Sequence, residues 1–218
     1  MPFPMTHLWI ADKIAELYPD KIKNPPQFYL GTLAPDSIHF RPDAVPDDKK
    51  TTHLCVGGEK WGEITNNSEW LANVLSFFDR NKKSGDMDDM DFIYGYCVHI
   101  IADIYNNISI WTPFLMKHPY ELEKGYGNIY HKEAAAVDLK LAQNFGNKDK
   151  IWILLEKSHS ITIPGIVFAE DIDKLKNNIL YTQYSDNSPV DTSANTLATY
   201  NDAIDFIENT AEFVLRKI

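Results

Sequence analysis

The sequence has few cysteines, no excess of basic residues and no long apolar run, and each shortage excludes a class of protein. Two cysteines, Cys55 and Cys97, are too few for a disulfide scaffold, and we expect both to be free, buried thiols. No apolar stretch reaches the roughly 18 residues of a membrane-spanning helix. The N-terminus lacks the pattern of a secretory signal, so a cytoplasmic location is predicted.

Basic residues are the minority among the charged side chains. Lys and Arg number 21 against 31 Asp and Glu, which gives a formal net charge of −10. This balance argues against nucleic acid as the main partner, which needs a basic surface, and it fits a site that gathers metal cations. Phosphate-binding loops, dinucleotide fingerprints and serine-hydrolase elbows are also absent. The sequence gives no indication of an oligomeric state.

Apolar residues recur at helical spacing along most of the chain, which predicts an all-α protein. We expect a single domain over residues 1–218, built as a bundle of about seven to nine helices. Thr6 is the expected N-cap of the first helix. The proline-rich segment 19–57 and the polar segment 184–195 are expected to be loops. The other expected helices cover residues 68–78, 88–106, 128–145, 149–157, 169–179 and 196–216.

The helix predicted after Asp91 is apolar on nearly all sides, which is typical of a helix in the centre of a fold. Its two strongly polar side chains, His99 and Asp103, are one helical turn apart on one face. A buried carboxylate is costly unless another group pairs with it. Two interpretations stay open here: a His–Asp hydrogen bond within the core, or two ligands of one metal ion.

Three further residues are candidate metal ligands. His7 is on the inward stripe of the first helix, Asp36 follows an apolar turn, and His53 is in a Thr-Thr-His-Leu segment. Each has an ordinary explanation as a core histidine, a turn former or a helix start. Together with His99 and Asp103, they predict a buried metal site with the helices packed around it.

These motifs, in this order, resemble the zinc-dependent phospholipase C family, to which the single-strand-specific zinc nucleases are distantly related. The resemblance covers roughly the first half of the chain and rests on Thr6-His7, GTLAPD at residues 31–36, Thr52-His53 and HIIAD at residues 99–103. It implies an all-α fold and a buried multi-zinc site that hydrolyses phosphate esters. It also implies that Asp36, His53 and His99 hold one zinc ion, that His7 serves a neighbouring zinc, and that Asp103 bridges the two.

One family motif, the His-x-x-x-Glu that helps to hold a third zinc, is absent from this chain. We therefore expect two zinc ions, or one. Asp36 is expected to bind metal and also to accept the proton of the attacking water. His131 and Asp138, seven residues apart on one helix face, are either ordinary core-edge residues or an extra ligand or supporting group of the centre.

The predicted function is metal-dependent hydrolysis of a phosphoric ester by a zinc-activated water. The expected substrate is a small phosphodiester or a phospholipid headgroup rather than nucleic acid. The alternative is a helical protein that kept the fold and binds a metal or ligand without turnover.

Overall fold

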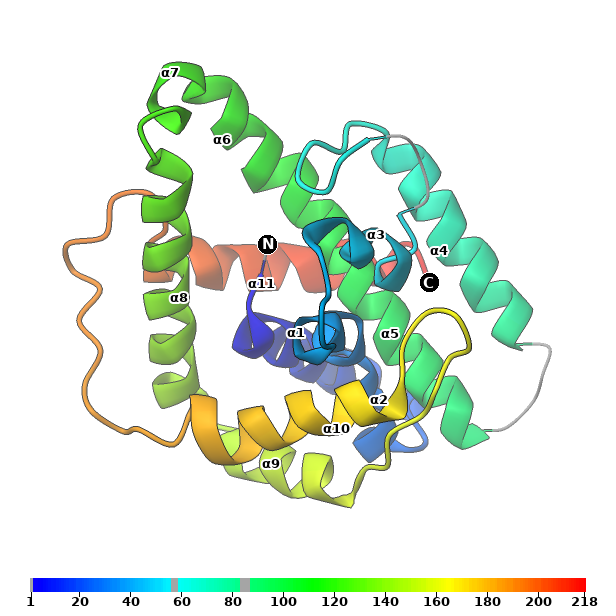
Figure 1. Ribbon diagram of the computed structural model, residues 1–218. Helices are drawn as coiled ribbons and strands as arrows, with labels where there is room; N and C mark the ends of the chain where they lie inside the picture. Colours follow the sequence, from blue (N-terminus) through cyan, green and yellow to red (C-terminus); the bar gives the residue numbers. More distant parts are fainter. Residues whose placement is uncertain (1, 56–58, 83–86) are drawn as a thin grey trace.

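The computed structural model describes residues 2–55, 59–82 and 87–218, and these form an all-α fold, as predicted (Figure 1). The described residues contain eleven α-helices and no strand, with one isolated bridge between Ile163 and Val167. The helices outnumber the seven to nine expected because several are single short turns: α3 (Lys49–Thr52), α6 (Thr112–Lys117) and α7 (Pro119–Leu122). No helix in this part of the chain is both long and apolar enough to cross a membrane.

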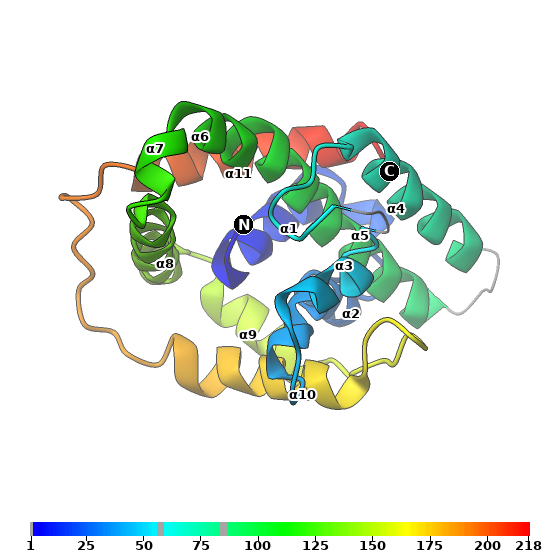
Figure 2. The same cartoon turned by 45° about the horizontal axis from the view of Figure 1, so that its top comes forward.

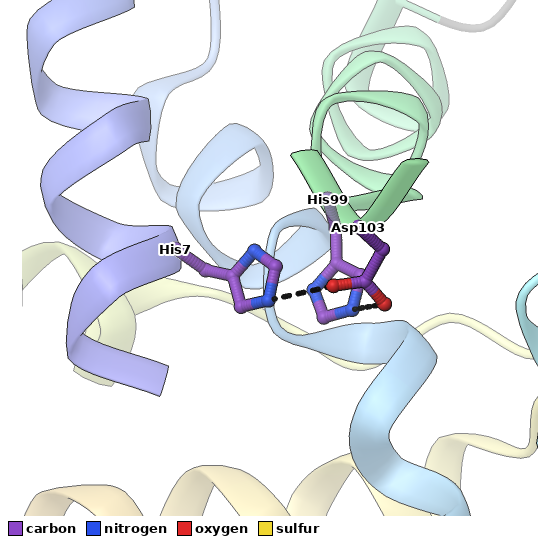
Figure 3. A group of neighbouring side chains, drawn as sticks. All are labelled: His7, His99 and Asp103. Atoms are coloured by element: carbon purple, nitrogen blue, oxygen red, sulfur yellow. Dashed lines mark ion pairs between the residues drawn. The ribbon is translucent and has the colours of Figure 1, made fainter. Parts of the chain in front are cut away.

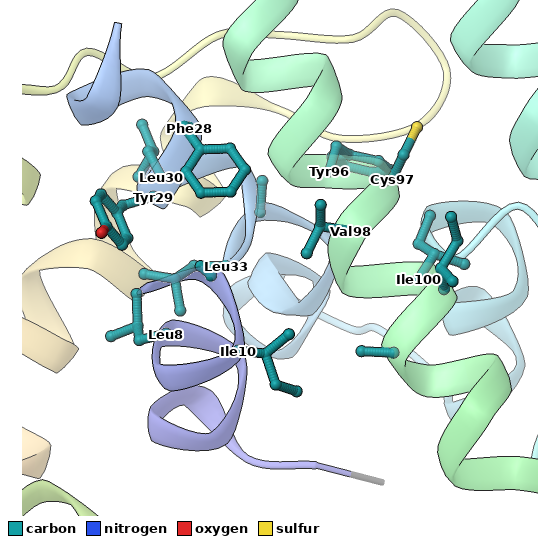
Figure 4. Packing of buried hydrophobic residues seen from close by; sticks show 14 of the residues in the cluster. Leu8, Ile10, Phe28, Tyr29, Leu30, Leu33, Tyr96, Cys97, Val98 and Ile100 are labelled. Atoms are coloured by element: carbon teal, nitrogen blue, oxygen red, sulfur yellow. The ribbon is translucent and has the colours of Figure 1, made fainter. Parts of the chain in front are cut away.

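Helix α5 (Met87–Asn106) runs through the middle of the molecule (Figure 1). It is packed against α1 (Pro4–Leu17), α2 (Pro25–Gly31), α4 (Asn67–Lys82) and α11 (Tyr200–Leu215). Figure 4 shows part of the core, with Val98 on the side of α5 that faces α1 and Ile100 on the opposite side. The strongly apolar composition of α5 follows from this central position.

The remaining helices enclose this centre. Helix α8 (Tyr126–Asn144) packs on α1, and α9 (Lys148–Lys157) packs on α2. Helix α10 (Ala169–Asn178) packs on the 3₁₀ helix η2 (Ala34–Phe40). Figures 1 and 2 show α8 on one side of the molecule and α9 and α10 along another, with an extended connection leading to α11 on the outside.

Two glycines allow α2 and α5 to approach closely. A Cβ atom on Gly31 would lie 2.1 Å from the carbonyl oxygen of Phe92, and one on Gly95 would lie 2.1 Å from that of Phe28. A side chain at either position would overlap backbone, so only glycine permits this crossing. The contact brings the residues that follow α2 against the middle of α5, where the candidate metal ligands are located.

Three local predictions are wrong. Thr6 is not an N-cap, because α1 begins at Pro4, and proline is favoured in a first turn. The segment predicted as a loop over residues 19–57 is largely helical over its described part, residues 19–55, because its prolines begin α2, η2 and the short 3₁₀ helices η1 (Pro19–Lys21) and η3 (Pro46–Asp48); residues 56 and 57 lie outside the described residues. The last helix begins at Tyr200 rather than 196, because Thr199 forms a capping box with its N-terminus.

The remaining expected helices are present, with ends shifted by a few residues. The prediction for the cysteines is also confirmed, since Cys55 and Cys97 are both free and buried.

Candidate metal centre

All five residues that were predicted to bind metal come together in the structure. They are contributed by four elements: His7 by α1, Asp36 by η2, His53 by the turn after α3, and His99 and Asp103 by α5. Two groups among the described residues have ligand atoms that all lie within 4.8 Å of one another and could hold a metal ion: His7, His99 and Asp103, and Asp36, His53 and His99. Figure 3 shows the first group, with His7 extending from α1 toward Asp103 on α5.

The Nε2 atom of His53 is at the centre of the second group. It lies 3.5 Å from Asp36 Oδ1, 3.3 Å from Asp103 Oδ2 and 3.4 Å from the Nε2 atom of His99. His99 Nε2 lies 3.7 Å from the same oxygen of Asp103. Two ring nitrogens and two carboxylate oxygens therefore face one another in an almost completely buried space.

Backbone carbonyl groups determine which ring nitrogens face this space. His99 Nδ1 lies 2.8 Å from the carbonyl oxygen of Thr32, and His53 Nδ1 lies 3.0 Å from that of Lys49. A carbonyl oxygen only accepts, so each Nδ1 carries the proton and donates it. When the rings are neutral, both Nε2 atoms are then left with a free lone pair, as a metal ligand requires.

The turn that carries His53 is held in place from two sides. The indole Nε1 of Trp70, on α4, donates a 2.6 Å hydrogen bond to the carbonyl oxygen of His53. The hydroxyl of Tyr96, on α5, donates to the carbonyl oxygen of Thr52. These contacts fix the His53 ring relative to α5, so the ligand positions are set before any ion binds.

His7 approaches Asp103 from the other side. Its ring stacks on that of His99, with centroids 3.7 Å apart and planes 9° from parallel, and its Nε2 lies 3.5 Å from Asp103 Oδ1. Asp103 therefore presents Oδ2 to His53 and Oδ1 to His7. Neither ring nitrogen of His7 has an aligned hydrogen bond within the described chain, although the residue is only 2 % exposed.

The protonation states of His7, His99 and Asp103 at neutral pH suit metal binding. Burial and the neighbouring His99 lower the pKa of His7 to about 3, and burial also lowers the pKa of His99, so both rings are neutral. Burial opposes ionisation of Asp103, but the surrounding imidazoles outweigh it and hold the pKa of this carboxyl below its usual value. Burial likewise opposes protonation of His53, yet the neighbouring carboxylates of Asp103 and Asp36 raise its pKa above the usual value, so a metal ion would displace a proton from this ring.

Lys49 was not predicted from the sequence and lies at the edge of the centre. It is 9 % exposed, and its ammonium nitrogen lies 2.8 Å from Asp36 Oδ1. Asp36 has a second neighbour in the more exposed His39, whose Nε2 is 3.6 Å from the same oxygen. Burial opposes ionisation of Asp36, but Lys49 and the histidines hold its pKa well below the usual value.

His131 and Asp138 belong to neither group of ligand atoms. His131 is exposed on α8, with its ring 5.5 Å from that of Trp111. Asp138 is buried; it accepts hydrogen bonds from the backbone nitrogen of Thr6 at 3.2 Å and from the hydroxyl of Tyr184 at 2.5 Å. Asp138 therefore holds the first turn of α1, next to His7, whereas His131 has no contact of this kind.

No protein-family model, curated protein or solved structure matches this chain. The function of the centre must therefore be inferred from its geometry and from the chemistry of its residues.

Proposed function

We propose that the protein is a metal-dependent phosphoric-ester hydrolase with zinc held by His7, Asp36, His53, His99 and Asp103. The observation that carries the proposal is the convergence of Nε2 of His53, Nε2 of His99 and an oxygen of Asp103 at 3.3–3.7 Å. Lone pairs that face one another in a buried space repel unless a cation or a proton lies between them. A shared proton can join one pair of these atoms, whereas a metal ion satisfies all of them together.

The separations also fit the preferred geometry of zinc. Zinc binds nitrogen and oxygen at about 2.0–2.2 Å, so neighbouring ligands of a tetrahedral ion lie about 3.3–3.5 Å apart. The measured distances from His53 Nε2 to its three neighbours are 3.5, 3.3 and 3.4 Å. Neutral imidazole together with carboxylate is a donor set suited to zinc or a similar transition metal.

The two groups would serve different purposes. Asp36, His53, His99 and Asp103 supply four ligands, which is the closed arrangement typical of structural zinc. On the other side of Asp103, His7 supplies a ligand of its own, which leaves positions for water and substrate, as in catalytic sites. Asp103, with one oxygen toward each group, would bridge two ions.

Bound zinc would neutralise the charge of a phosphoester and lower the pKa of a water molecule. The residues of the chain orient these partners. Thr32 and Lys49 hold the rings of His99 and His53 through their carbonyl groups. Asp36 would act mainly as a ligand, because its lowered pKa makes it a weak proton acceptor; its predicted role as the base stays a prediction.

A small phosphoester, or the headgroup of a phospholipid, is the proposed substrate. The net charge of −10 opposes binding of a polyanion such as nucleic acid. The resemblance of residues 1–110 to zinc-dependent phospholipases C supports the same class of reaction.

The second candidate function is binding of metal or ligand without turnover. One observation favours this candidate. In the group of His7, His99 and Asp103, only His7 is not shared, because His99 and Asp103 also face His53 in the other group. If that side fails to hold an ion, the four-ligand side alone would give a stable metalloprotein without an open position.

Metal analysis of untagged protein tests both candidates. We expect two bound zinc equivalents, or one if the His7 side stays empty, and loss of metal in His99→Ala. His159→Ala is the matched control, because His159 is exposed and lies outside both groups. Turnover of chromogenic phosphodiesters by two-zinc protein would support the hydrolase, and one zinc without turnover would support the binding protein. Well-folded wild-type protein that binds no metal would refute both.

A further inference from the structure

The candidate metal centre is accessible to solvent mainly at Asp36. The side chain of this residue is 14 % exposed, whereas those of the other four candidate ligands are at most 1 % exposed. A molecule that arrives from solvent therefore meets the centre first at this carboxylate. Lys49 and His39 flank it, with side-chain nitrogens 2.8 Å and 3.6 Å from its Oδ1 atom.

Lys49 is an unexpected neighbour for a metal ligand, because a cation beside Asp36 opposes the binding of another cation there. The residue is almost buried, and its ammonium nitrogen lies 5.4 Å from the centre of the Trp61 ring. Its backbone carbonyl lies 3.0 Å from Nδ1 of His53, which ties the backbone of Lys49 to the centre. A charge placed in such surroundings acts more strongly on a nearby anion than a charge in water does.

The ammonium group of Lys49 also has hydrogen-bonding capacity left. A lysine carries three N–H donors. Over the described part of the chain, the one ion-pair partner of this ammonium is Asp36. A ligand at the exposed edge of the centre could therefore accept a hydrogen bond from Lys49 without displacing a second protein group.

The charges of the centre call for an anion when zinc is bound. The carboxylates of Asp36 and Asp103 balance one zinc ion, since histidine ligands are neutral. Lys49 then leaves one positive charge in excess, and a second zinc ion adds two more. Excess charge in a largely buried space is costly unless an ion of opposite sign pairs with it. With an uncharged residue in place of Lys49, the one-zinc centre would have no such excess.

We propose that Lys49 binds a non-bridging oxygen of a phosphate group, and that it makes the zinc-loaded centre a site for phosphate oxyanions. This inference rests on the proposed binding of zinc but not on turnover, so it applies to both candidate functions. Without metal, Lys49 pairs with Asp36 and the excess of positive charge is absent, so phosphate should bind much more weakly. Non-bridging oxygens are common to free phosphate and to the diester of a phospholipid headgroup.

Calorimetric titration with inorganic phosphate tests the proposal on protein that is loaded with zinc and freed of excess metal. Lys49→Met should bind phosphate about 10–100-fold more weakly than wild type, the loss expected for one hydrogen bond between charged groups. Lys50→Met is the matched control, because Lys50 is adjacent in sequence but its ammonium lies 4.0 Å from Asp47 instead. This variant should bind phosphate like wild type.

Diethyl phosphate distinguishes the two sources of the phosphate group. A loss of affinity for both probes in Lys49→Met would identify phosphodiesters as ligands of Lys49, and a loss for inorganic phosphate alone would identify a terminal phosphate. Zinc content and melting curves of the same samples establish that each variant is loaded and folded.

A second measurement uses wild-type protein, so it does not depend on the folding of a variant. Acetylation by N-hydroxysuccinimidyl acetate, followed by tandem mass spectrometry, reports the accessibility of each lysine. In zinc-loaded protein, phosphate should slow the acetylation of Lys49 and leave that of Lys50 unchanged.

The outcomes separate this inference from the proposed function. Unchanged phosphate affinity in zinc-loaded Lys49→Met, no protection of Lys49 by phosphate, or equal phosphate affinity with and without zinc would overturn the role of Lys49 while leaving the zinc centre intact. Protein that binds no zinc would refute the proposed function, and this inference with it.

Discussion

Replacing Asp103 by Asn should destabilise the metal-free protein and should destabilise the zinc-bound protein further. Without metal, Asp103 is a fully buried carboxylate whose oxygens face the imidazoles of His7, His53 and His99. These rings hold its pKa below the usual value, so the folded protein favours the charged form. Losing this interaction should cost about 1–3 kcal/mol, which is a fall of about 2–12 °C in melting temperature at this size.

The zinc-bound protein should lose more stability than the metal-free protein. An amide lacks the charge that a bridging carboxylate shares between two cations, so both ions should bind less tightly and activity should be lost. A loss of 100-fold in affinity lowers the stabilisation by zinc by about 2.7 kcal/mol. If Asp103 only orients His99, affinity should instead fall about 10–100-fold while both ions still bind at high concentration.

Asp12→Asn is the matched control for this experiment. Asp12 is equally a buried carboxylate of the core, 3 % exposed, but it already accepts hydrogen bonds from Tyr29 at 2.9 Å and Asn147 at 2.7 Å. Its substitution should lower both melting temperatures alike and leave zinc content unchanged. Scanning calorimetry and elemental analysis on the two variants give all the required values. Equal shifts of metal-free and zinc-bound Asp103→Asn, with unchanged zinc content, would refute the role assigned to Asp103.

Three further substitutions test other parts of the structure. Gly95→Ala places a methyl group 2.1 Å from the carbonyl oxygen of Phe28, so α2 and α5 must separate. Overpacking of this kind costs about 1–3 kcal/mol, which is measurable as a lower melting temperature. Zinc titration of the same variant should show weaker binding. Lys49→Met removes a cation 2.8 Å from a ligand oxygen, so zinc affinity should rise about tenfold or more in calorimetry, with no change in Lys50→Met. Burial raises the pKa of Asp138 to about 7, so stability should fall between about pH 4 and 7, by up to about 1.4 kcal/mol per pH unit, and then level off. Urea unfolding of Asp138→Asn should lack this fall, and identical profiles for variant and wild type would contradict it.

Helices with a sustained apolar period could be predicted from the sequence, because the signal is local. The apolar stretch before Asp103 predicts α5, and its two polar residues predict where the candidate site lies. The short helices between residues 19 and 52 could not be predicted in this way. Proline at their first turns is equally typical of loops, and packing against α5, α9 and α10 decides the outcome.

The site was predictable to the extent that its residues are unusual in their local context. A His or Asp on an apolar element needs a partner, and this singled out His99 and Asp103. Lys49 follows two aspartates and precedes another lysine, which is the pattern of a solvated surface, and only the fold brings it to Asp36. His131 and Asp138 share a helix face by spacing, yet only Asp138 lies where α1 covers α8.

His7 decides between the two candidate functions. A neutral, buried imidazole has one donor and one acceptor nitrogen, and each costs free energy if unpaired. The rings of His53 and His99 satisfy one nitrogen through a backbone carbonyl and present the other to the centre, so their geometry is fixed by the fold. The ring of His7 has no such bond in the described chain, and stacking on His99 is its main support. The position of the His7 ring therefore depends most on the ion that it would share with Asp103. The His7 side is the side of the centre with open coordination positions, and it is also the side where protein contacts constrain the ligand least.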